Sequence, residues 1–485
     1  MNTSMIRFIL GNILRLQSLF LLLPIIVACI YKENTFVTYI CVSAACLLVG
    51  TLMTLRKPKN NVFYLKEGCV ATALSWIVLS ISGAIPFILT GEIPSFTDAL
   101  FETVSGFSTT GSSILTNVEA LTYSSLIWRS FTNWIGGMGV LVFLLAIVPM
   151  SGGSNINLMK AESPGPSVGK LVPKMRSTAR ILYLIYIGLT LLTFVFLLFG
   201  KMPVFDALAT SFSTAGTGGF GIKNDSMASY STYCHWVISI AMMLFGINFN
   251  AYYFLLFKEA KRAFKMEEVR WYLIIVVLST IVIFTDLMQF YPSLGKALTD
   301  AFFQVTTIIT TTGFATADCN LLSATSKSTL ILIMFIGGCA GSTAGGLKMS
   351  RLIILVKTIF KELKSYTHPK SIFKIKMDDK PIEHEVVRST NVYFITYMII
   401  FVVSVFCLTF ENKDLVTVFT AVVATFNNIG PGLERVGPTG NFSHFTDFSK
   451  IVMIFDMLAG RLELFPLLML FHPELWKETF KRRVK

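Results

Sequence analysis

Four stretches of the chain repeat one pattern of threonine, glycine and apolar residues. They read DALFETVSGFSTTGSS from Asp98, DALATSFSTAGTGGFG from Asp206, DAFFQVTTIITTTGFA from Asp300 and TVFTAVVATFNNIGPG from Thr417. A glycine stands 13 positions after the first residue of every stretch: Gly111, Gly219, Gly313 and Gly430. Glycine adopts backbone conformations that other residues resist, which suits a strand whose carbonyl oxygens face a ligand. Rings of such oxygens can replace the hydration shell of K⁺.

In register, the pieces around these glycines resemble four degenerate copies of the TVGYG filter of potassium channels. One copy would be weak evidence because TTG also occurs by chance, whereas four copies at matching places are strong evidence. The residues predicted to coordinate the ion are Thr109, Thr110, Gly111, Thr217, Gly218, Gly219, Thr311, Thr312, Gly313, Asn428, Ile429 and Gly430.

Short helices must hold these pieces in place. An aspartate caps a helix and suits the positive end of its dipole, so Asp98, Asp206 and Asp300 are predicted to be helix starts. The opposite, negative ends would then converge on a cation near the bilayer centre.

The composition indicates that this chain lies in a membrane. Of 485 residues 53% are hydrophobic and 14% are charged, against about 25% charged in soluble domains. The formal net charge is +13, and a bilayer explains it better than a nucleic-acid partner, so no nucleic acid is expected. About 20 apolar residues cross a bilayer. Ten apolar runs are long enough: 16–31, 36–54, 69–91, 126–149, 181–199, 236–257, 271–290, 329–355, 391–410 and 449–471.

Lysine and arginine gather in alternate segments between these runs, which predicts that both termini are cytoplasmic. The four glycine-bearing stretches lie on the other side, and irregular backbone is tolerated at membrane depth only where protein or water surrounds it. The predicted fold is therefore all-α and integral to the membrane, with ten transmembrane helices and four re-entrant pore loops in pseudo-fourfold repeats. The units are an N-terminal hairpin (1–66) and four pore repeats (67–180, 181–270, 271–388 and 389–485).

In these features the chain resembles the Trk/Ktr/HKT superfamily of potassium transporters, and within it the bacterial Trk membrane subunit. The four filter pieces, the additional N-terminal pair of spans and two further segments carry the resemblance. These segments are IGGCAGSTAGGLKMSR from Ile336 and DMLAGRLELFP from Asp456.

The segment from Ile336 should break the eighth span, because each glycine in a helix costs about 1 kcal/mol relative to alanine. The resemblance implies that it is an intramembrane loop that obstructs the ion path and moves on opening. Close helix packing through small residues is the alternative. The predicted gating residues in it are Gly337, Gly338, Gly341, Ser342, Thr343, Gly345 and Gly346.

Arg461 stands among apolar residues, and a charge inside a membrane is a functional hypothesis by default. The resemblance implies that Arg461 projects toward the pore below the filter. A structural pair with Glu463 or Asp456, or a side chain reaching the membrane surface, remains open. Arg129, near the outer interface, is expected to have a surface role.

The resemblance implies uptake of K⁺, which is both the transported and the filter-bound ion, with no covalent or redox cofactor. Gly111 favours K⁺, because members with serine there favour Na⁺. The implied partners are a second copy in a homodimer and a cytosolic ring of nucleotide-binding, RCK-type (TrkA-like) regulatory subunits that docks on 357–388. The resemblance also implies that the protein is located in the bacterial cell membrane. A Na⁺-permeable or Na⁺/H⁺-coupled symporter of the same fold remains an alternative.

A membrane-embedded enzyme is the distant alternative. Gly216–Gly221 matches the dinucleotide pattern GxGxxG but lacks a strand–helix–strand context. The five histidines lie at span edges or in loops, so a catalytic pair with Ser112 or Ser113 is not expected. The eight cysteines form no CxxC pair and are expected to be small core residues. We therefore expect a transporter.

Overall fold

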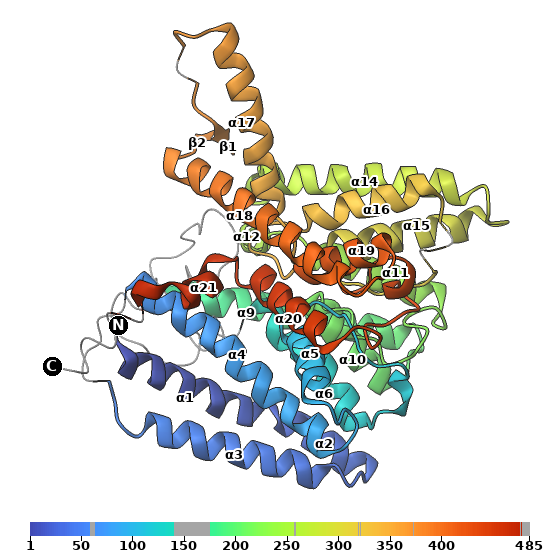
Figure 1. The fold of residues 1–485 in the computed structure, drawn as a ribbon. Helices are drawn as coiled ribbons and strands as arrows, with labels where there is room; N and C mark the ends of the chain where they lie inside the picture. The colour runs from blue at the N-terminus through green and yellow to red at the C-terminus, as the bar shows by residue number, and fades with distance from the viewer. Residues whose placement is uncertain are drawn as a thin grey trace.

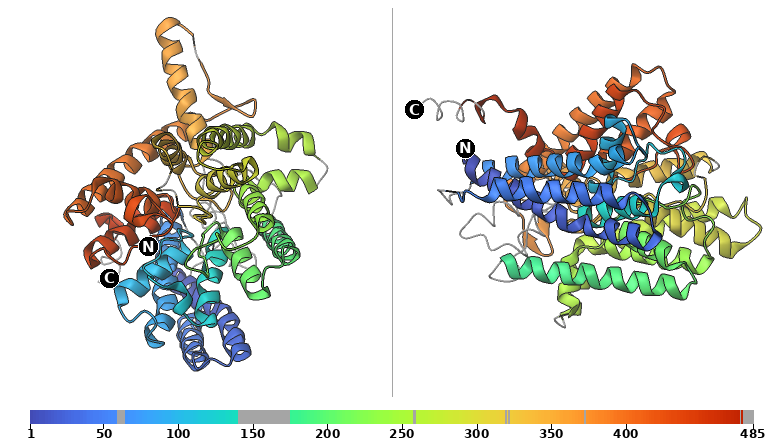
Figure 2. Two further views of the ribbon diagram at one scale, coloured as in Figure 1. Left: turned by 90° about the vertical axis from the view of Figure 1, so that its right-hand side faces the viewer. Right: turned by 90° about the horizontal axis from the view of Figure 1, so that it is seen from below.

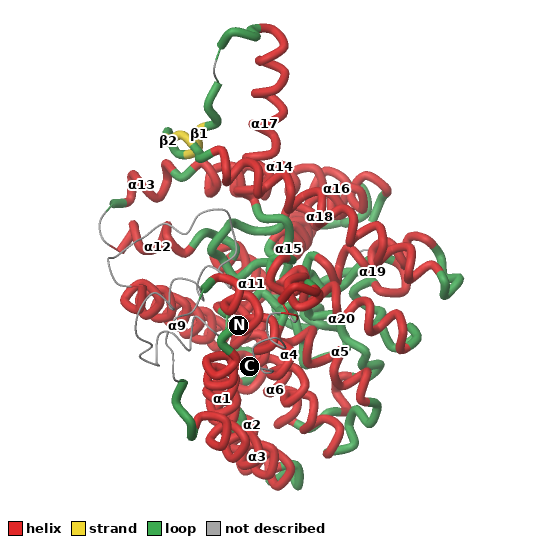
Figure 3. The backbone as a smooth tube through the Cα atoms, turned by 60° about the vertical axis from the view of Figure 1, so that its left-hand side comes forward, coloured by secondary structure: helices red, strands yellow, loops and turns green. Residues whose placement is uncertain are grey.

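The computed structural model describes residues 1–58, 64–139, 175–256, 259–318, 320, 322–371, 373–475 and 477, and these are mostly helical (Figures 1 and 3). The end of the predicted span 126–149 and the basic segment that follows it lie outside the described residues. The only strands in the described ranges are β1 (Lys376–Met377) and β2 (Lys380–Pro381), which form a small antiparallel hairpin.

Six described helices are long and apolar enough to cross a membrane. Their apolar side chains remain exposed over much of the outer surface, as on α3 and α18, which fits contact with lipid rather than water. These helices are α1 and α2 taken together (Thr3–Phe20 and Leu22–Tyr31), α3 (Phe36–Thr54), α4 (Leu65–Leu89), α9 (Met175–Phe199), α14 (Glu267–Leu287) and α18 (His384–Thr409).

The first helix starts at Thr3, so the predicted start at residue 16 was wrong. Its polar side chains are used inside the protein: Gln17 is fully buried and its Oε1 accepts a hydrogen bond of 2.5 Å from Ser82 Oγ on α4. A polar residue paired with a neighbouring helix does not end an apolar span, and sequence alone could not reveal that pairing.

Three predicted spans are interrupted instead of continuous. The sixth bends by 92° between α11 (Thr232–Phe245) and α12 (Phe249–Leu256). The eighth divides into α16 (Ala324–Ile336) and α17 (Met349–Thr367), where its glycines predicted a break. In the tenth, α20 (Asp447–Arg461) stops before α21 (Phe465–Leu468), because Glu463 and Leu464 both have φ of 61°.

Four short helices each pack between two neighbours that precede and follow them in the chain. They are α5 (Phe96–Phe107), α10 (Val204–Gly216), α15 (Leu294–Ile309) and α19 (Leu415–Phe426). Their flanking helices are α4 and α6 (Tyr123–Met138), α9 and α11, α14 and α16, and α18 and α20. The chain therefore repeats one helix–short helix–helix unit.

The predicted helix starts are confirmed to within one turn for Asp98 and Asp206, although neither residue is the N-cap, and the prediction was wrong for Asp300. Asp98 and Asp206 lie in the first turns of their helices, but the residues at the N-cap positions are Ser95 and Pro203. Asp300 lies within α15, which begins at Leu294. These carboxylates bind neighbouring segments instead, as in the 2.5 Å ion pair between Asp98 and Lys450 of α20.

The units follow one another around a common centre. The left view of Figure 2 looks along many of the long helices, and the colours pass around the molecule from blue through green and yellow to red. The hairpin of α1–α3 packs on α4 and α6 outside this circle, and α17 projects from the helix bundle beside the β1–β2 hairpin (Figure 1). The remaining short elements are η1 (Val118–Ala120), α13 (Ala260–Lys265), η3 (Glu434–Val436) and η4 (Met469–Phe471).

Candidate functional site

The four short helices end in the same unusual backbone conformation. Its φ is positive at Thr109 (58°), Thr217 (53°), Thr311 (55°) and Asn428 (56°), a conformation that is rare for β-branched residues such as threonine. The N–H of the next residue then bonds to a carbonyl five residues back, at 2.8–2.9 Å in every copy. These bonds run from Thr110 to Ser105, from Gly218 to Ser213, from Thr312 to Thr307 and from Ile429 to Ala424. Four sequences that differ thus adopt one helix C-terminal motif.

The four predicted glycines meet one another around the centre. Each has positive φ, and each faces the carbonyl oxygen of the neighbouring segment so closely that a Cβ there would crowd or collide with it. Gly111 faces the oxygen of Gly218, Gly219 that of Thr312, Gly313 that of Ile429, and Gly430 that of Thr110. The contacts form a closed cycle of four, and only glycine fits at these positions.

Side chains complete the junction between the first and last segments. Ser112 Oγ donates to the Gly430 carbonyl at 2.8 Å, and Asn428 Nδ2 donates to Thr110 Oγ1 at 2.9 Å. Each bond joins residues 318 positions apart in the chain. The twelve predicted coordinating residues therefore belong to one assembly of segments drawn from four separate parts of the sequence.

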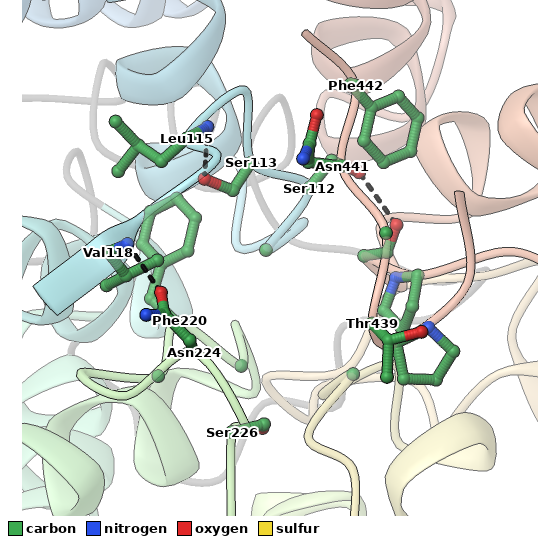
Figure 4. Close-up of a pocket in the computed structure, with 18 of the residues that line it drawn as sticks. Ser112, Ser113, Leu115, Val118, Phe220, Asn224, Ser226, Thr439, Asn441 and Phe442 are labelled. Atoms are coloured by element: carbon green, nitrogen blue, oxygen red, sulfur yellow. Dashed lines mark hydrogen bonds between the residues drawn. The ribbon is translucent and has the colours of Figure 1, made fainter. Parts of the chain in front are cut away.

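A pocket of about 180 Å³ opens directly on this cycle. Loop segments from the four units surround it in Figure 4, where Ser112, Phe220 and Phe442 mark its wall. All four glycines, Gly111, Gly219, Gly313 and Gly430, lie in its lining. The remainder of the lining is polar in part and includes Asn224 and Asn441. The pocket therefore gives access to the cycle formed by the four glycines.

Arg129 does not have the surface role that we expected. Its side chain is 2% exposed and forms a 2.7 Å ion pair with Glu102, which is fully buried. Its apolar neighbours in the sequence gave no sign of a partner, because Glu102 lies on α5 and the two meet only when α5 packs against α6.

The predicted gating segment lies against the ends of the third and fourth short helices. Gly345 N donates to Thr311 Oγ1 at 2.6 Å, and Gly346 N donates to the Asn427 carbonyl at 3.0 Å. The structure thus brings the loop between α16 and α17 into direct contact with two of the four filter-like segments. Gly337, Gly338, Gly341 and Ser342 lie earlier in this loop, nearer α16. Gly338 and Gly341 approach Gly246 and Asn248 at the bend of the sixth span.

Arg461 binds the same loop. Its guanidinium donates to the Thr343 carbonyl at 3.1 Å and to the carbonyls of Gly136 and Gly137 at 2.5 and 2.6 Å. The two acidic residues that we considered as partners of Arg461 bind other side chains. Glu463 pairs with Arg351, and Asp456 accepts a 2.7 Å hydrogen bond from Ser404 Oγ. Arg461 therefore connects the loop to the C-terminal end of α6.

Glu268 is an anchor of the loop that the sequence did not indicate. It is 4% exposed, and its carboxylate accepts hydrogen bonds from Ala340 N at 2.5 Å, Ser350 N at 3.1 Å and Asn248 Nδ2 at 3.2 Å. Its partners are mostly backbone groups, which carry no sequence signal. One acidic side chain at the start of α14 thus holds both the loop and the first turn of α17.

The comparisons with known proteins agree with this arrangement. The family model TrkH, described as "Cation transport protein", matches residues 34–481. The Trk system potassium uptake protein TrkH of Salmonella typhimurium is 35% identical over 99% of this chain and 100% of its own. The Escherichia coli K12 proteins TrkH and TrkG are 34% and 31% identical, over 99% and 98% of this chain and 100% of theirs.

A solved structure has the same fold. The crystal structure of the potassium transporter TrkH from Vibrio parahaemolyticus superposes with a TM-score of 0.88 at 32% identity, over 98% of this chain and 100% of that one. The relatives are named as transporters and not as enzymes, in agreement with the expectation from sequence. The family model, the relatives and the shared fold together place this chain in the TrkH family of cation transport proteins.

Proposed function

We propose that this protein takes up K⁺ across the bacterial cell membrane through a filter formed by the four glycine-bearing segments. The closed cycle of glycines and carbonyl oxygens carries the proposal, because a ring of backbone oxygens can replace the water around a dehydrated cation. The names of the relatives, which are potassium uptake proteins, supply the identity of the ion. The membrane potential would drive entry, at about 2.3 kcal/mol per charge per 100 mV.

The proposed architecture is ten transmembrane helices with four re-entrant pore loops. It divides into the N-terminal hairpin (1–66) and four pore repeats (67–180, 181–270, 271–388 and 389–485), with both termini in the cytoplasm. The four helix–short helix–helix units support this division, since each short helix ends at the central cycle. The negative ends of four helix dipoles would then face the ion.

The proposed gate consists of the loop from Gly337 to Gly346 together with Arg461. Two observations support it: the loop touches Thr311 directly, and Arg461 binds the loop at Thr343. The loop contacts the filter-like segments but lines no part of the pocket, so in this proposal an ion that enters from the pocket meets the loop after the filter. Opening would require the loop to move.

The proposed partners are a second copy of this chain and a cytosolic ring of nucleotide-binding regulatory subunits. The projecting α17 and the β1–β2 hairpin support a docking role, since α17 carries Lys361 and Lys364 in the part that extends from the helix bundle. They connect to the gate through the chain itself, because α17 directly follows the loop.

The test is cation flux in proteoliposomes, measured with K⁺, ⁸⁶Rb⁺ and Na⁺, with and without the regulatory subunit. Wild-type protein should pass K⁺ in preference to Na⁺. Gly313→Ser should lose most of this preference, since a side chain there would strike the Ile429 carbonyl. Gly188→Ser is the matched control, because no atom lies within 4 Å of the place that a Cβ on Gly188 would occupy. Unchanged selectivity in Gly313→Ser would refute the filter, and Na⁺-driven or proton-driven K⁺ entry would favour a symporter.

A further inference from the structure

A buried ion pair within the first unit supports the filter-like segment of that unit, and its arginine also reaches the segment of the second unit. Glu102 on α5 and Arg129 on α6 lie 2.7 Å apart with side chains 0% and 2% exposed. Burying two opposite charges costs desolvation energy that their attraction does not reliably exceed. A pair of this kind is therefore better explained by the geometry that it fixes than by the stability that it adds.

The pair holds corresponding positions of the two segments. Glu102 accepts hydrogen bonds from Ser113 Oγ at 3.0 Å and from Ile114 N at 3.0 Å, just after Gly111. Arg129 donates from Nη1 to the Gly221 carbonyl at 3.2 Å, just after Gly219. Ser113 and Gly221 each stand two residues beyond the glycine of their segment.

Further contacts fix the guanidinium. Its Nε donates to Glu102 at 2.8 Å, its Nη2 reaches Ser113 Oγ at 3.4 Å, and its carbon lies 4.2 Å from the centre of the Phe220 ring. Only the planar, multiply donating guanidinium can serve both segments at once, because an ammonium group has neither the reach nor the fork.

This charged connection belongs to one corner of the fourfold arrangement. The residues equivalent to Glu102 in the other units, four positions into each repeat, are Thr210, Gln304 and Ala421. Gln304 Nε2 donates to the Ala317 carbonyl of its own unit at 3.2 Å, and the alanine has no polar side chain. The first unit therefore has a charged glutamate where the equivalent positions of the other units have threonine, glutamine and alanine.

We propose that Arg129 and Glu102 are positioning residues that set the separation of the first two filter segments, and thereby the choice among monovalent cations. The proposal rests on the proposed function. A fixed positive charge at the pocket would be a different role for Arg129, and lysine would preserve it. Arg129→Lys therefore separates geometry from charge.

The experiment measures reversal potentials or fluxes of K⁺, Rb⁺ and Na⁺ for purified Arg129→Lys, Glu102→Gln and Ser113→Ala, with thermal unfolding in parallel. Arg129→Lys should reduce the K⁺ over Na⁺ preference by about tenfold or more, the size of a lost charge-assisted hydrogen bond. Ser113→Ala buries no unpaired charge and should change selectivity in the same direction by a smaller factor. Arg262→Gln, which breaks an exposed 3.0 Å ion pair with Glu259 away from the filter, is the control and should keep wild-type selectivity.

The outcomes distinguish this inference from the proposed function. Wild-type selectivity in both Arg129→Lys and Ser113→Ala would overturn the positioning role. If Arg129→Lys does not fold, the result for Ser113→Ala decides. A wild-type protein that passes Na⁺ as readily as K⁺ would refute K⁺-selective uptake, yet a changed order of cations in the variants would still support the positioning role.

Discussion

At the scale of single residues, the central segments combine strain with close packing. Thr109, Thr217 and Thr311 hold a left-handed conformation that costs about 1–2 kcal/mol each for a residue with a Cβ. Such strain persists only where the surrounding structure determines the conformation, and it gathers at functional sites. Here the surroundings are the neighbouring segments themselves, because all three threonines are fully buried.

Adding a single methyl group at Gly345 tests the proposed gating loop. A Cβ there would collide with the Asn427 carbonyl and crowd Thr311 Oγ1 at 3.2 Å. Gly345→Ala should therefore push the loop away from the filter segments and raise basal K⁺ flux in proteoliposomes about fivefold or more, since overpacking costs about 1–3 kcal/mol. Gly188→Ala is the control. Flux that stays at the wild-type level in Gly345→Ala would contradict a gate at this loop.

We expect Glu411, between α18 and α19, to make the stability of the protein depend on pH. Its side chain is 7% exposed, and burial by itself would raise the pKa. Hydrogen bonds from Lys413 and from Thr446 outweigh burial and lower the pKa of Glu411 to about 2, from 4.5. A lowered pKa contributes stability that is complete above about pH 4.5 and is lost as the pH falls toward 2.

The measurement is the melting temperature of wild type and Glu411→Gln from pH 7 downward. Glu411→Gln should melt at a lower temperature at pH 7, and the gap between the two proteins should narrow below about pH 4.5. Asp447→Asn, in the first turn of α20, is a comparison nearby. A gap that is constant with pH would show that the carboxylate is not held in its charged form.

At the scale of elements, the breaks within the predicted spans determine the structure around the gating loop more than the lengths of the helices do. The bend of the sixth span, the loop in the eighth and the end of α20 meet in one region, where Cys339 N donates to the Gly246 carbonyl at 3.0 Å and Arg461 binds Thr343. Backbone freed by an interruption must find partners. In this protein the interruptions supply hydrogen-bond partners to one another, so we expect movement of one to affect the other two.

Glu268 tests this dependence between elements. Glu268→Ala would leave Ala340 N and Ser350 N without their acceptor, at about 1–3 kcal/mol for each buried group. We expect a lower melting temperature and a higher basal K⁺ flux than in wild type. Glu362→Ala, on the exposed part of α17, should change neither. Lower stability with unaltered flux would mean that the loop is anchored by Glu268 but does not control the path.

At the scale of the whole molecule, stability and ion binding should be linked because the site is made from all four units. Asn428 Nδ2 bonds to Thr110 Oγ1 and to the Met457 carbonyl, each at 2.9 Å, and so closes the circle between the last unit and the first. An ion bound by the closed circle would favour the folded protein by about 2.7 kcal/mol at a hundred times its Kd.

Wild-type protein should therefore melt at a higher temperature in potassium chloride than in choline chloride. Asn428→Ala should lose most of this difference in melting temperature. The substitution removes both hydrogen bonds, and alanine tolerates positive φ less well than asparagine does. Asn412→Ala is matched, since Asn412 also has positive φ (52°) but is exposed in the loop after α18. A K⁺ effect of equal size in all three proteins would place ion binding elsewhere.

The sequence by itself determined the properties that depend on neighbours along the chain. Apolar runs identified the long helices because a helix in lipid must be apolar over its own length. The repeated glycines at Gly111, Gly219, Gly313 and Gly430 identified the four segments, and the glycines after Ile336 identified the interruption of the eighth span. Each of these signals is local, so it can be read without knowing what packs against it.

The tertiary structure alone decided which distant residues meet. Arg129 looked like a surface residue and Asp300 like a helix cap, yet one is buried with Glu102 and the other lies within α15. Glu268 gave no signal because it binds mainly backbone groups, which every residue possesses. A charge inside a protein is stabilised by partners brought by folding, and their identity depends on packing between helices that lie far apart in the sequence.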